Sequence, residues 1–201
     1  MDRRDFVEGC SAAAACASAG GAAGLGALAG SLLGAPAFAA DTRERRYARS
    51  LLCDERGDPF KAASLRAQTN YVFQYPFEAT PVFLLNLGAA AQPHTLSTKD
   101  KANYAWPGGV GPQRSLVAFS AICAHQLVYP TQQVSFISFR KTKSPKGLQD
   151  NLIHCCADHS VYDPAEGARV VSGPAPQPLA GIVLDHDAAQ DALFAVGTVG
   201  A

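Results

Sequence analysis

This sequence has few charged and few aromatic side chains, and its charges balance. Lys and Arg together number 17, as do Asp and Glu, so the formal net charge is zero. A chain with no excess of either charge lacks the net positive charge that favours binding to nucleic acid or to another acidic polymer. Aromatic residues make up only 8%, whereas there are 18 glycines and 13 prolines. That composition favours a loop-rich β protein over a helical bundle.

The number and positions of the cysteines do not indicate a small fold held together by disulfides. There are six in 201 residues, at Cys10, Cys16, Cys53, Cys123, Cys155 and Cys156. The first two fall in an N-terminal leader, and two of the other four belong to the candidate metal ligands described below. The length is enough for one domain with a sizeable hydrophobic core.

The N-terminal segment is typical of an export signal. Two adjacent arginines, Arg3 and Arg4, precede an apolar Phe6, which is the pattern of a twin-arginine signal. An uncharged run rich in alanine and glycine extends over residues 9–40 and contains a small-x-small cleavage site at 37–39. We therefore predict a signal peptide or membrane anchor at 1–39, followed by a domain at 40–201. A buried or amphipathic alanine-rich helix is the alternative.

Two short segments carry the chemistry that organises the rest of the chain. They are Cys123-Ala124-His125 and Cys156-Ala157-Asp158-His159, and each offers one thiolate and one imidazole. Both pairs are close enough in sequence to lie on a single loop, so two loops complete a four-ligand set. Such a set suits a structural zinc ion or an iron–sulfur centre with mixed ligands; unrelated buried Cys and His residues are the third interpretation. Zinc modules usually pair Cys with Cys and His with His, which disfavours zinc.

The residues after the second segment favour one of these interpretations. They are Ser160-Val161-Tyr162-Asp163, then Gly167, Gly173-Pro174-Ala175-Pro176 and Leu179. Over about residues 115–199 the chain resembles Rieske proteins, in which an aromatic–Asp pair, a turn glycine and a Gly-Pro-Ala loop wrap a 2Fe–2S cluster. The resemblance implies that Cys123 and Cys156 ligate one iron, and that His125 and His159 ligate the other. It also implies cofactor contacts from Ser160, Tyr162, Gly173 and Pro174.

Departures from the family pattern bear on the kind of Rieske protein. Val128 and Asp158 stand where quinol-oxidising members carry a cysteine pair joined as a disulfide, and Gln126 replaces an apolar contact residue. Both differences count against quinol oxidation. The second loop also lacks the glycine that usually follows the last histidine. When this one deletion is allowed, Ser160 and Tyr162 match the hydroxyls that hydrogen-bond a cluster sulfur and a cysteine sulfur in high-potential members.

Two residues next to the second segment resemble ligands. Cys155 directly precedes Cys156, and we expect a buried free thiol there; a disulfide with Cys53 is the alternative in an oxidising compartment. His154 is not assigned as a ligand, because C-x-x-H from Cys156 to His159 fits the expected spacing and C-x-x-x-H from Cys155 does not.

The hydrophobic runs predict an all-β fold. Strands are expected at 71–75, 81–87, 115–120, 181–185 and 192–196, because apolar, β-branched and aromatic residues there are bounded by turn residues. Residues 41–61 are charged and are expected to form a surface segment or a short helix, and 89–112 an irregular stretch. Between the ligand loops we expect a β-hairpin, with strand positions at Val134, Phe136 and Phe139. Its basic tip of Arg140, Lys141, Lys143 and Lys146 either steers an acidic partner or is simply solvated.

The predicted architecture is a Rieske domain, an antiparallel β-sandwich base with an inserted cluster-binding subdomain at about 121–178. The expected function is transfer of single electrons, without catalysis, by an exported carrier or small subunit of a periplasmic respiratory oxidoreductase. The expected partner is a cytochrome c or an oxidoreductase large subunit, and the leader either is removed or anchors the protein to the outer face of the cytoplasmic membrane. The alternatives are the Rieske subunit of a membrane quinol–cytochrome c reductase and a zinc-stabilised exported binding module.

Overall fold

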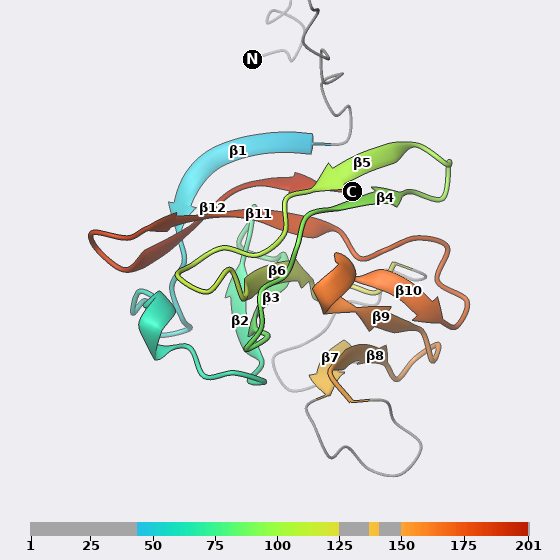
Figure 1. The fold of residues 1–201 in the computed structure, drawn as a ribbon, viewed down its shortest axis with the longest axis horizontal. Coiled ribbons are helices and arrows are strands. Elements are labelled where there is room, and N and C mark those ends of the chain that lie inside the picture. The colour runs from blue at the N-terminus through green and yellow to red at the C-terminus, as the bar shows by residue number, and fades with distance from the viewer. Residues whose placement is uncertain (1–43, 125–136, 141–149, 201) are drawn as a thin grey trace, which may run out of the picture. The chain divides into compact units, whose positions relative to one another are not determined.

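The computed structural model describes residues 44–124, 137–140 and 150–200. Their regular structure consists of strands and two short 3-10 helices, η1 (Ala62–Ser64) and η2 (Pro164–Glu166), which confirms the predicted all-β fold (Figure 1). The strands are β1 (Glu44–Leu51), β2 (Tyr71–Gln74), β3 (Pro81–Asn86), β4 (His94–Ser97), β5 (Asn103–Trp106), β6 (Leu116–Ser120), β7 (Ile137–Arg140), β8 (Leu152–Cys155), β9 (Val161–Asp163), β10 (Arg169–Ser172), β11 (Gly181–Asp187) and β12 (Ala192–Val199).

The largest sheet has six strands in the order β1-β12-β11-β6-β3-β2, and all neighbouring strands in it are antiparallel. Five of these strands, β2, β3, β6, β11 and β12, coincide with the strands predicted from the sequence. They were predictable because each is an apolar run that ends at glycine, proline or polar turn residues.

Two neighbouring strands of this sheet, β3 and β6, are buried on both faces. Along β3, Val82 and Leu84 belong to one hydrophobic cluster, while Phe83 and Leu85 belong to another. Successive side chains of a strand point to opposite faces, so an unbroken apolar run supplies a core on each side of the sheet. One of these two cores extends to the candidate site.

A second, four-stranded sheet packs on that core. Its order is β10-β9-β8-β7, and it is antiparallel throughout. β7 and β8 form the described part of the predicted hairpin between the ligand loops, and Phe139 lies in β7 as expected. The predicted strand positions Val134 and Phe136 lie outside the described residues, as do the tip residues Lys141, Lys143 and Lys146.

The expectation of a short helix in the charged segment 41–61 is wrong, because residues 44–51 form the edge strand β1. This strand pairs with β12, for example Glu44 with Val199 and Leu51 with Phe194. The Arg49 guanidinium lies 3.3 Å from the centre of the Phe194 ring and donates to Asp185 at 3.0 Å. Pairing with a free sheet edge decides the conformation here, because the charged side chains fit one exposed strand as well as a helix.

The stretch 89–112, expected to be irregular, contains a separate hairpin of β4 and β5. Its inward residues alternate along the strands, and Leu96, Tyr104 and Trp106 are buried. The Trp106 ring stacks on His94 at 6.3 Å and tilts against Phe119 of β6 at 5.7 Å. The strands are short and polar on their outer face, so their local signal was weak and burial of Trp106 is what orders them.

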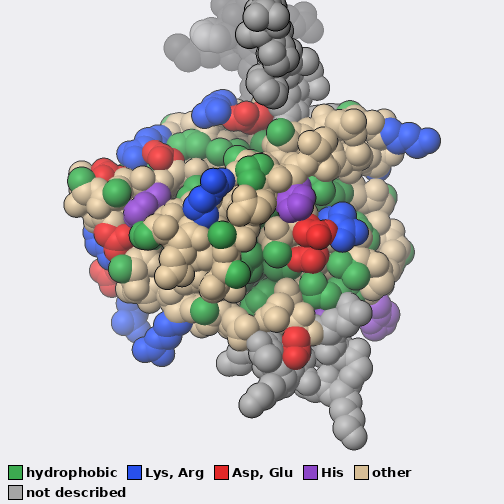
Figure 2. Space-filling model, in the orientation of Figure 1, with side chains coloured by type: hydrophobic (Ala, Val, Ile, Leu, Met, Phe, Trp, Pro, Cys, Tyr) green, Lys and Arg blue, Asp and Glu red, His purple; other side chains and the backbone are tan. Residues whose placement is uncertain are grey.

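The predicted leader at 1–39, including Arg3 and Arg4, lies outside the described residues. Within the part of the chain that the structure describes, no helix is both long and apolar enough to cross a membrane. On the face shown in Figure 2, acidic and basic side chains are interspersed with polar and apolar ones. The visible described surface therefore carries no large patch of one charge that would favour a strongly charged partner.

Candidate metal centre

The first cysteine segment is delivered by β6, at the centre of the large sheet. At the end of the strand, the Ser120 N–H donates to Ala180 O at 2.9 Å, and the following Ala121 N–H donates to Pro81 O at 3.0 Å. These two hydrogen bonds fix the backbone where the chain leaves the sheet and enters the loop. Cys123 follows with 6% of its surface exposed and belongs to the core cluster. Its predicted partner His125 lies outside the described residues.

The second segment begins at the end of β8, where two neighbouring cysteines have different surroundings. Cys155 is a buried free thiol, as predicted, with 2% exposure. Cys53 is also free, so the alternative disulfide between them is not formed. The predicted ligand Cys156 is exposed, and its sulfur lies 3.7 Å from Arg140 Nη2. The predicted ligand His159 is exposed as well.

Three potential ligand atoms converge where the two loops meet. The sulfurs of Cys123 and Cys155 and a carboxylate oxygen of Asp158 all lie within 4.8 Å of one another. The Cys123 thiol donates to Asp158 Oδ2 at 3.3 Å. Among the described residues, this is the group of His, Cys, Asp or Glu side chains arranged to hold a metal ion, and it contains neither Cys156 nor His159.

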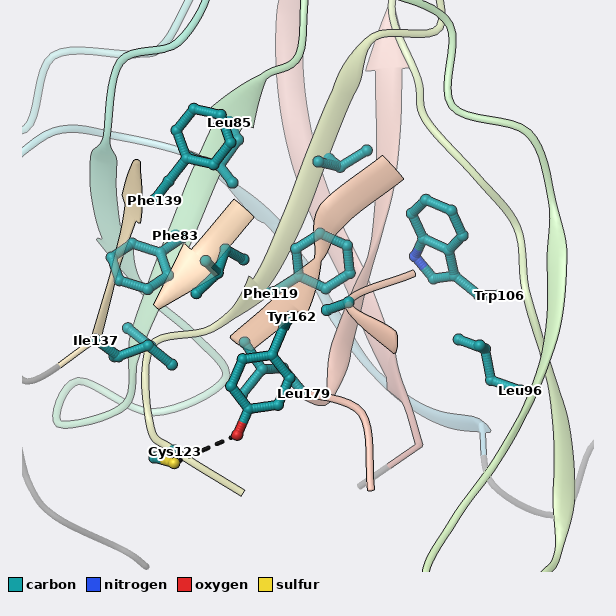
Figure 3. Packing of buried hydrophobic residues seen from close by; sticks show 14 of the residues in the cluster. Phe83, Leu85, Leu96, Trp106, Phe119, Cys123, Ile137, Phe139, Tyr162 and Leu179 are labelled. Carbon is teal, nitrogen blue, oxygen red and sulfur yellow. Dashed lines mark hydrogen bonds between the residues drawn. The ribbon is translucent and has the colours of Figure 1, made fainter. Parts of the chain in front are cut away.

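Tyr162 completes the inner wall of this group. Its ring is fully buried in the core cluster, and its hydroxyl lies 3.3 Å from the Cys123 sulfur. Figure 3 shows the hydroxyl pointing out of the cluster at that sulfur. A tyrosine placed in this way donates a hydrogen bond to the sulfur once the thiol has lost its proton.

Of the other predicted cofactor-contact residues, Ser160 and Gly173 lie directly against each other. Ser160 is fully buried, and its Oγ accepts a hydrogen bond from the Ala175 N–H at 3.1 Å. Gly173 has φ +94°, and a Cβ there would lie 2.5 Å from the Ser160 Cα. Only glycine permits this close approach. Pro174 is exposed.

The aromatic–Asp pair and the turn glycine of the sequence motif have local structural roles. Asp163 follows Tyr162 and caps η2 by accepting a hydrogen bond from the Ala165 N–H at 2.9 Å. Gly167 ends η2 in the left-handed conformation, with φ +71°. A Cβ on Gly167 would lie 3.1 Å from the Trp106 ring. The turn therefore packs against the tryptophan that anchors the β4–β5 hairpin.

The surroundings of Cys155 favour the protonated form of this buried thiol. Burial, with hydrogen bonding to Asp158 adding to it, raises the pKa of the Cys155 thiol to about 12. Burial would by itself raise the pKa of Asp158, but hydrogen bonds from Cys155, from the Ser160 backbone and from Cys123 outweigh it and lower that pKa. Burial and the bond to Cys123 raise the pKa of Tyr162. Metal binding at Cys155 must therefore displace its thiol proton.

The donor chemistry fits a metal centre that takes sulfur ligands. Two buried thiols from different loops, a nearby carboxylate and a tyrosine hydroxyl aimed at one sulfur form a mainly anionic pocket once the thiols deprotonate. Sequence reasoning missed Cys155 and Asp158 as members of this group. Strand alternation was the available signal, because Cys155 is two residues after the buried Ile153 and shares its face.

Comparison with known proteins identifies one similar solved structure. No protein-family model matches the chain. Among solved structures, the soluble domain of the Rieske protein II from Sulfolobus acidocaldarius is 30% identical in sequence to this chain. The match covers 76% of this chain and 78% of that one, with a TM-score of 0.55.

Proposed function

Because the chain belongs to the Rieske protein family, we propose that it is an exported electron-transfer protein. It is either a carrier or the small subunit of a periplasmic respiratory oxidoreductase, and it catalyses no reaction alone. The cofactor is a Rieske-type 2Fe–2S cluster, which when bound accepts and releases one electron at a time. The partner is a redox protein such as a cytochrome c or an oxidoreductase large subunit. The ligands Cys123, His125, Cys156 and His159 remain the prediction made from the sequence.

The observation that carries this proposal is the meeting of two cysteine loops against a rigid core, with the Tyr162 hydroxyl 3.3 Å from the Cys123 sulfur. Strand β6 fixes the backbone before Cys123, and β8 fixes the backbone at Cys155. A redox site on rigid elements changes its geometry little between oxidation states. The surrounding apolar side chains exclude water from the inner side of the site.

The test is to reduce the full-length protein, after anaerobic assembly with iron and sulfide, and to record its electron paramagnetic resonance spectrum. A rhombic signal with an average g value below that of an all-cysteine 2Fe–2S ferredoxin supports the proposal, because non-sulfur ligands on one iron change the signal in this way. Metal analysis that finds zinc without iron and sulfide contradicts it and favours the zinc-stabilised binding module.

Replacing Tyr162 by phenylalanine is expected to lower the reduction potential by on the order of 40–60 mV. The lost hydrogen bond to the Cys123 sulfur stabilises the additional negative charge of the reduced state, and one such bond is worth ~1 kcal/mol. A redox titration measures the shift. The matched control is Tyr71→Phe, which removes a hydroxyl that accepts from the Arg66 N–H at 3.0 Å. Equal potentials in Tyr162→Phe and the unmodified protein would contradict the role given to this hydroxyl.

Export is the second part of the proposal, and it rests on the twin arginines. Replacing Arg3 and Arg4 by lysine together is expected to retain the protein in the cytoplasm, because the export machinery recognises the arginine pair. Cell fractionation followed by immunoblotting measures the distribution. The control makes the same double change at Arg45 and Arg46 in the exposed strand β1. If the variant with both Arg3 and Arg4 replaced by lysine accumulates in the periplasm to the same level as the unmodified protein, the proposed twin-arginine export is contradicted.

A further inference from the structure

We propose that the second loop offers Cys155 and Asp158 as ligands of the metal centre, in place of the Cys156 and His159 predicted from the sequence. The inference rests on the proposed function, because it concerns the ligands of the same cluster. It places a carboxylate oxygen where the Rieske resemblance implies an imidazole nitrogen.

The first argument for this ligand set is the direction of the Cys155 side chain compared with that of its neighbour Cys156. Strand β8 is held on both sides, with Ile153 opposite Phe139 of β7 and opposite Tyr162 of β9. Residues two apart in a strand share a face, so Cys155 points to the same side as the fully buried Ile153. That side is the core cluster that also contains Cys123. Changing which cysteine faces Cys123 would require a register slip of β8, which would also turn Ile153 away from this cluster.

The turn after β8 fixes the position of the Asp158 carboxylate. The Cys155 N–H donates to Ser160 O at 2.8 Å, and the His159 N–H donates to Cys155 O at 3.0 Å, which closes the turn. Within it, the Ser160 N–H donates to Asp158 Oδ1 at 3.0 Å. One carboxylate oxygen is therefore held by the backbone, while the other, Oδ2, faces the Cys123 sulfur at 3.3 Å. When a metal displaces the protons of the Cys123 and Cys155 thiols, these sulfurs no longer donate to the Asp158 carboxylate, which then faces the metal together with them.

The backbone of His159 is the second, independent ground. Its φ is +64°, a left-handed conformation that glycine adopts readily and other residues adopt rarely. The sequence comparison needed one deletion, because the glycine expected after the last histidine was missing. With Asp158 at the ligand position, His159 itself stands at the glycine position and adopts its conformation. The deletion disappears, and Ser160 and Tyr162 keep their places.

An aspartate ligand has a measurable consequence for the electron that the centre carries. A carboxylate is negative, whereas a ligating imidazole is neutral, so the cluster with Asp158 has a more negative net charge. Net charge is one of the factors that set the potential of iron–sulfur clusters, and a more negative cluster is harder to reduce. The variant Asp158→His is therefore expected to raise the potential.

The deciding experiment uses the full chain assembled anaerobically with iron and sulfide, in four single variants. Iron and sulfide content, visible absorption and electron paramagnetic resonance are measured on each. In Cys155→Ser and Asp158→Ala, the iron and sulfide content is expected to fall by at least about tenfold. Mutation of residues that only support metal ligands already lowers metal affinity by ~10–100-fold. Cys156→Ser and His159→Gly are expected to keep it. His159→Gly is also expected to raise the Tm, because glycine relieves the left-handed strain.

A fifth variant supplies a readout of ligand identity. In Asp158→His labelled with nitrogen-15 histidine, pulsed electron paramagnetic resonance is expected to show one more coupled histidine nitrogen than in the unmodified protein, together with a higher potential.

The possible outcomes separate this inference from the proposed function. Loss of the cluster in Cys156→Ser or His159→Gly overturns the inference, as does its retention in Cys155→Ser or Asp158→Ala. Circular dichroism identifies any variant that fails to fold, and the two variants at exposed positions still decide the matter if Cys155→Ser does so. An unmodified protein that takes up no iron and sulfide overturns the proposed function, and the inference with it.

Discussion

Replacing Cys123 by serine is expected to remove the metal centre while leaving the fold in place. Cys123 belongs to the ligand set predicted from the sequence and also to the group that the structure brings together. Its sulfur contacts the Tyr162 hydroxyl and the Asp158 carboxylate, both at 3.3 Å. No other first-loop sulfur is near enough in sequence to replace it. Iron content is expected to fall by more than about tenfold, since changes to outer partners alone cost ~10–100-fold in metal affinity.

The measurement is iron and sulfide analysis with the visible spectrum of the same sample. Cys53→Ser is the matched control, because Cys53 is a free, half-buried thiol in the segment that leads from β1 to η1. The control is expected to keep the full spectrum. A Cys123→Ser protein with the same iron content as Cys53→Ser would show that the centre is not held at this loop.

Replacing Trp106 by alanine is expected to have the largest effect on stability, with a loss of about 3–5 kcal/mol, the range for deleting a buried Trp or Phe side chain. Trp106 is 2% exposed and contacts three parts of the fold. Its ring stacks on His94, packs against Phe119 and closes over Gly167. The cavity left behind cannot collapse easily, because these neighbours belong to three different sheets or turns.

Thermal unfolding measures this effect, and the Tm is expected to fall by roughly 10 °C for a domain of this size. Phe77→Ala is the matched control, because it removes an aromatic ring that is 66% exposed and makes one edge-on contact with Tyr47. Its cost is expected to stay below about 1.5 kcal/mol. A Tm for Trp106→Ala that equals the Tm of Phe77→Ala would contradict the anchoring role of Trp106.

The two errors in the predicted fold share one physical cause. Residues 44–51 have no strong preference of their own, and they become β1 because β12 offers an unpaired edge. Residues 94–106 alternate polar with apolar side chains too briefly to be distinguished from a loop, and Trp106 orders them by packing on Phe119. In both places a distant partner decides the conformation, and that partner is not visible in the local sequence.

The sequence alone determined the fold class, five strands of the large sheet and the family. Each depends on a local pattern, either alternation of apolar residues or fixed spacing between ligand-type and turn residues, and such patterns survive without knowledge of the contacts. The tertiary structure decided which thiol of the Cys155–Cys156 pair faces Cys123. That choice depends on the register of β8 between β7 and β9, which places Ile153 in the core and Cys155 with it. The spacing to His159 favours Cys156, whereas the paired strand β8 ends at Cys155 and turns that side chain to the same side as Ile153.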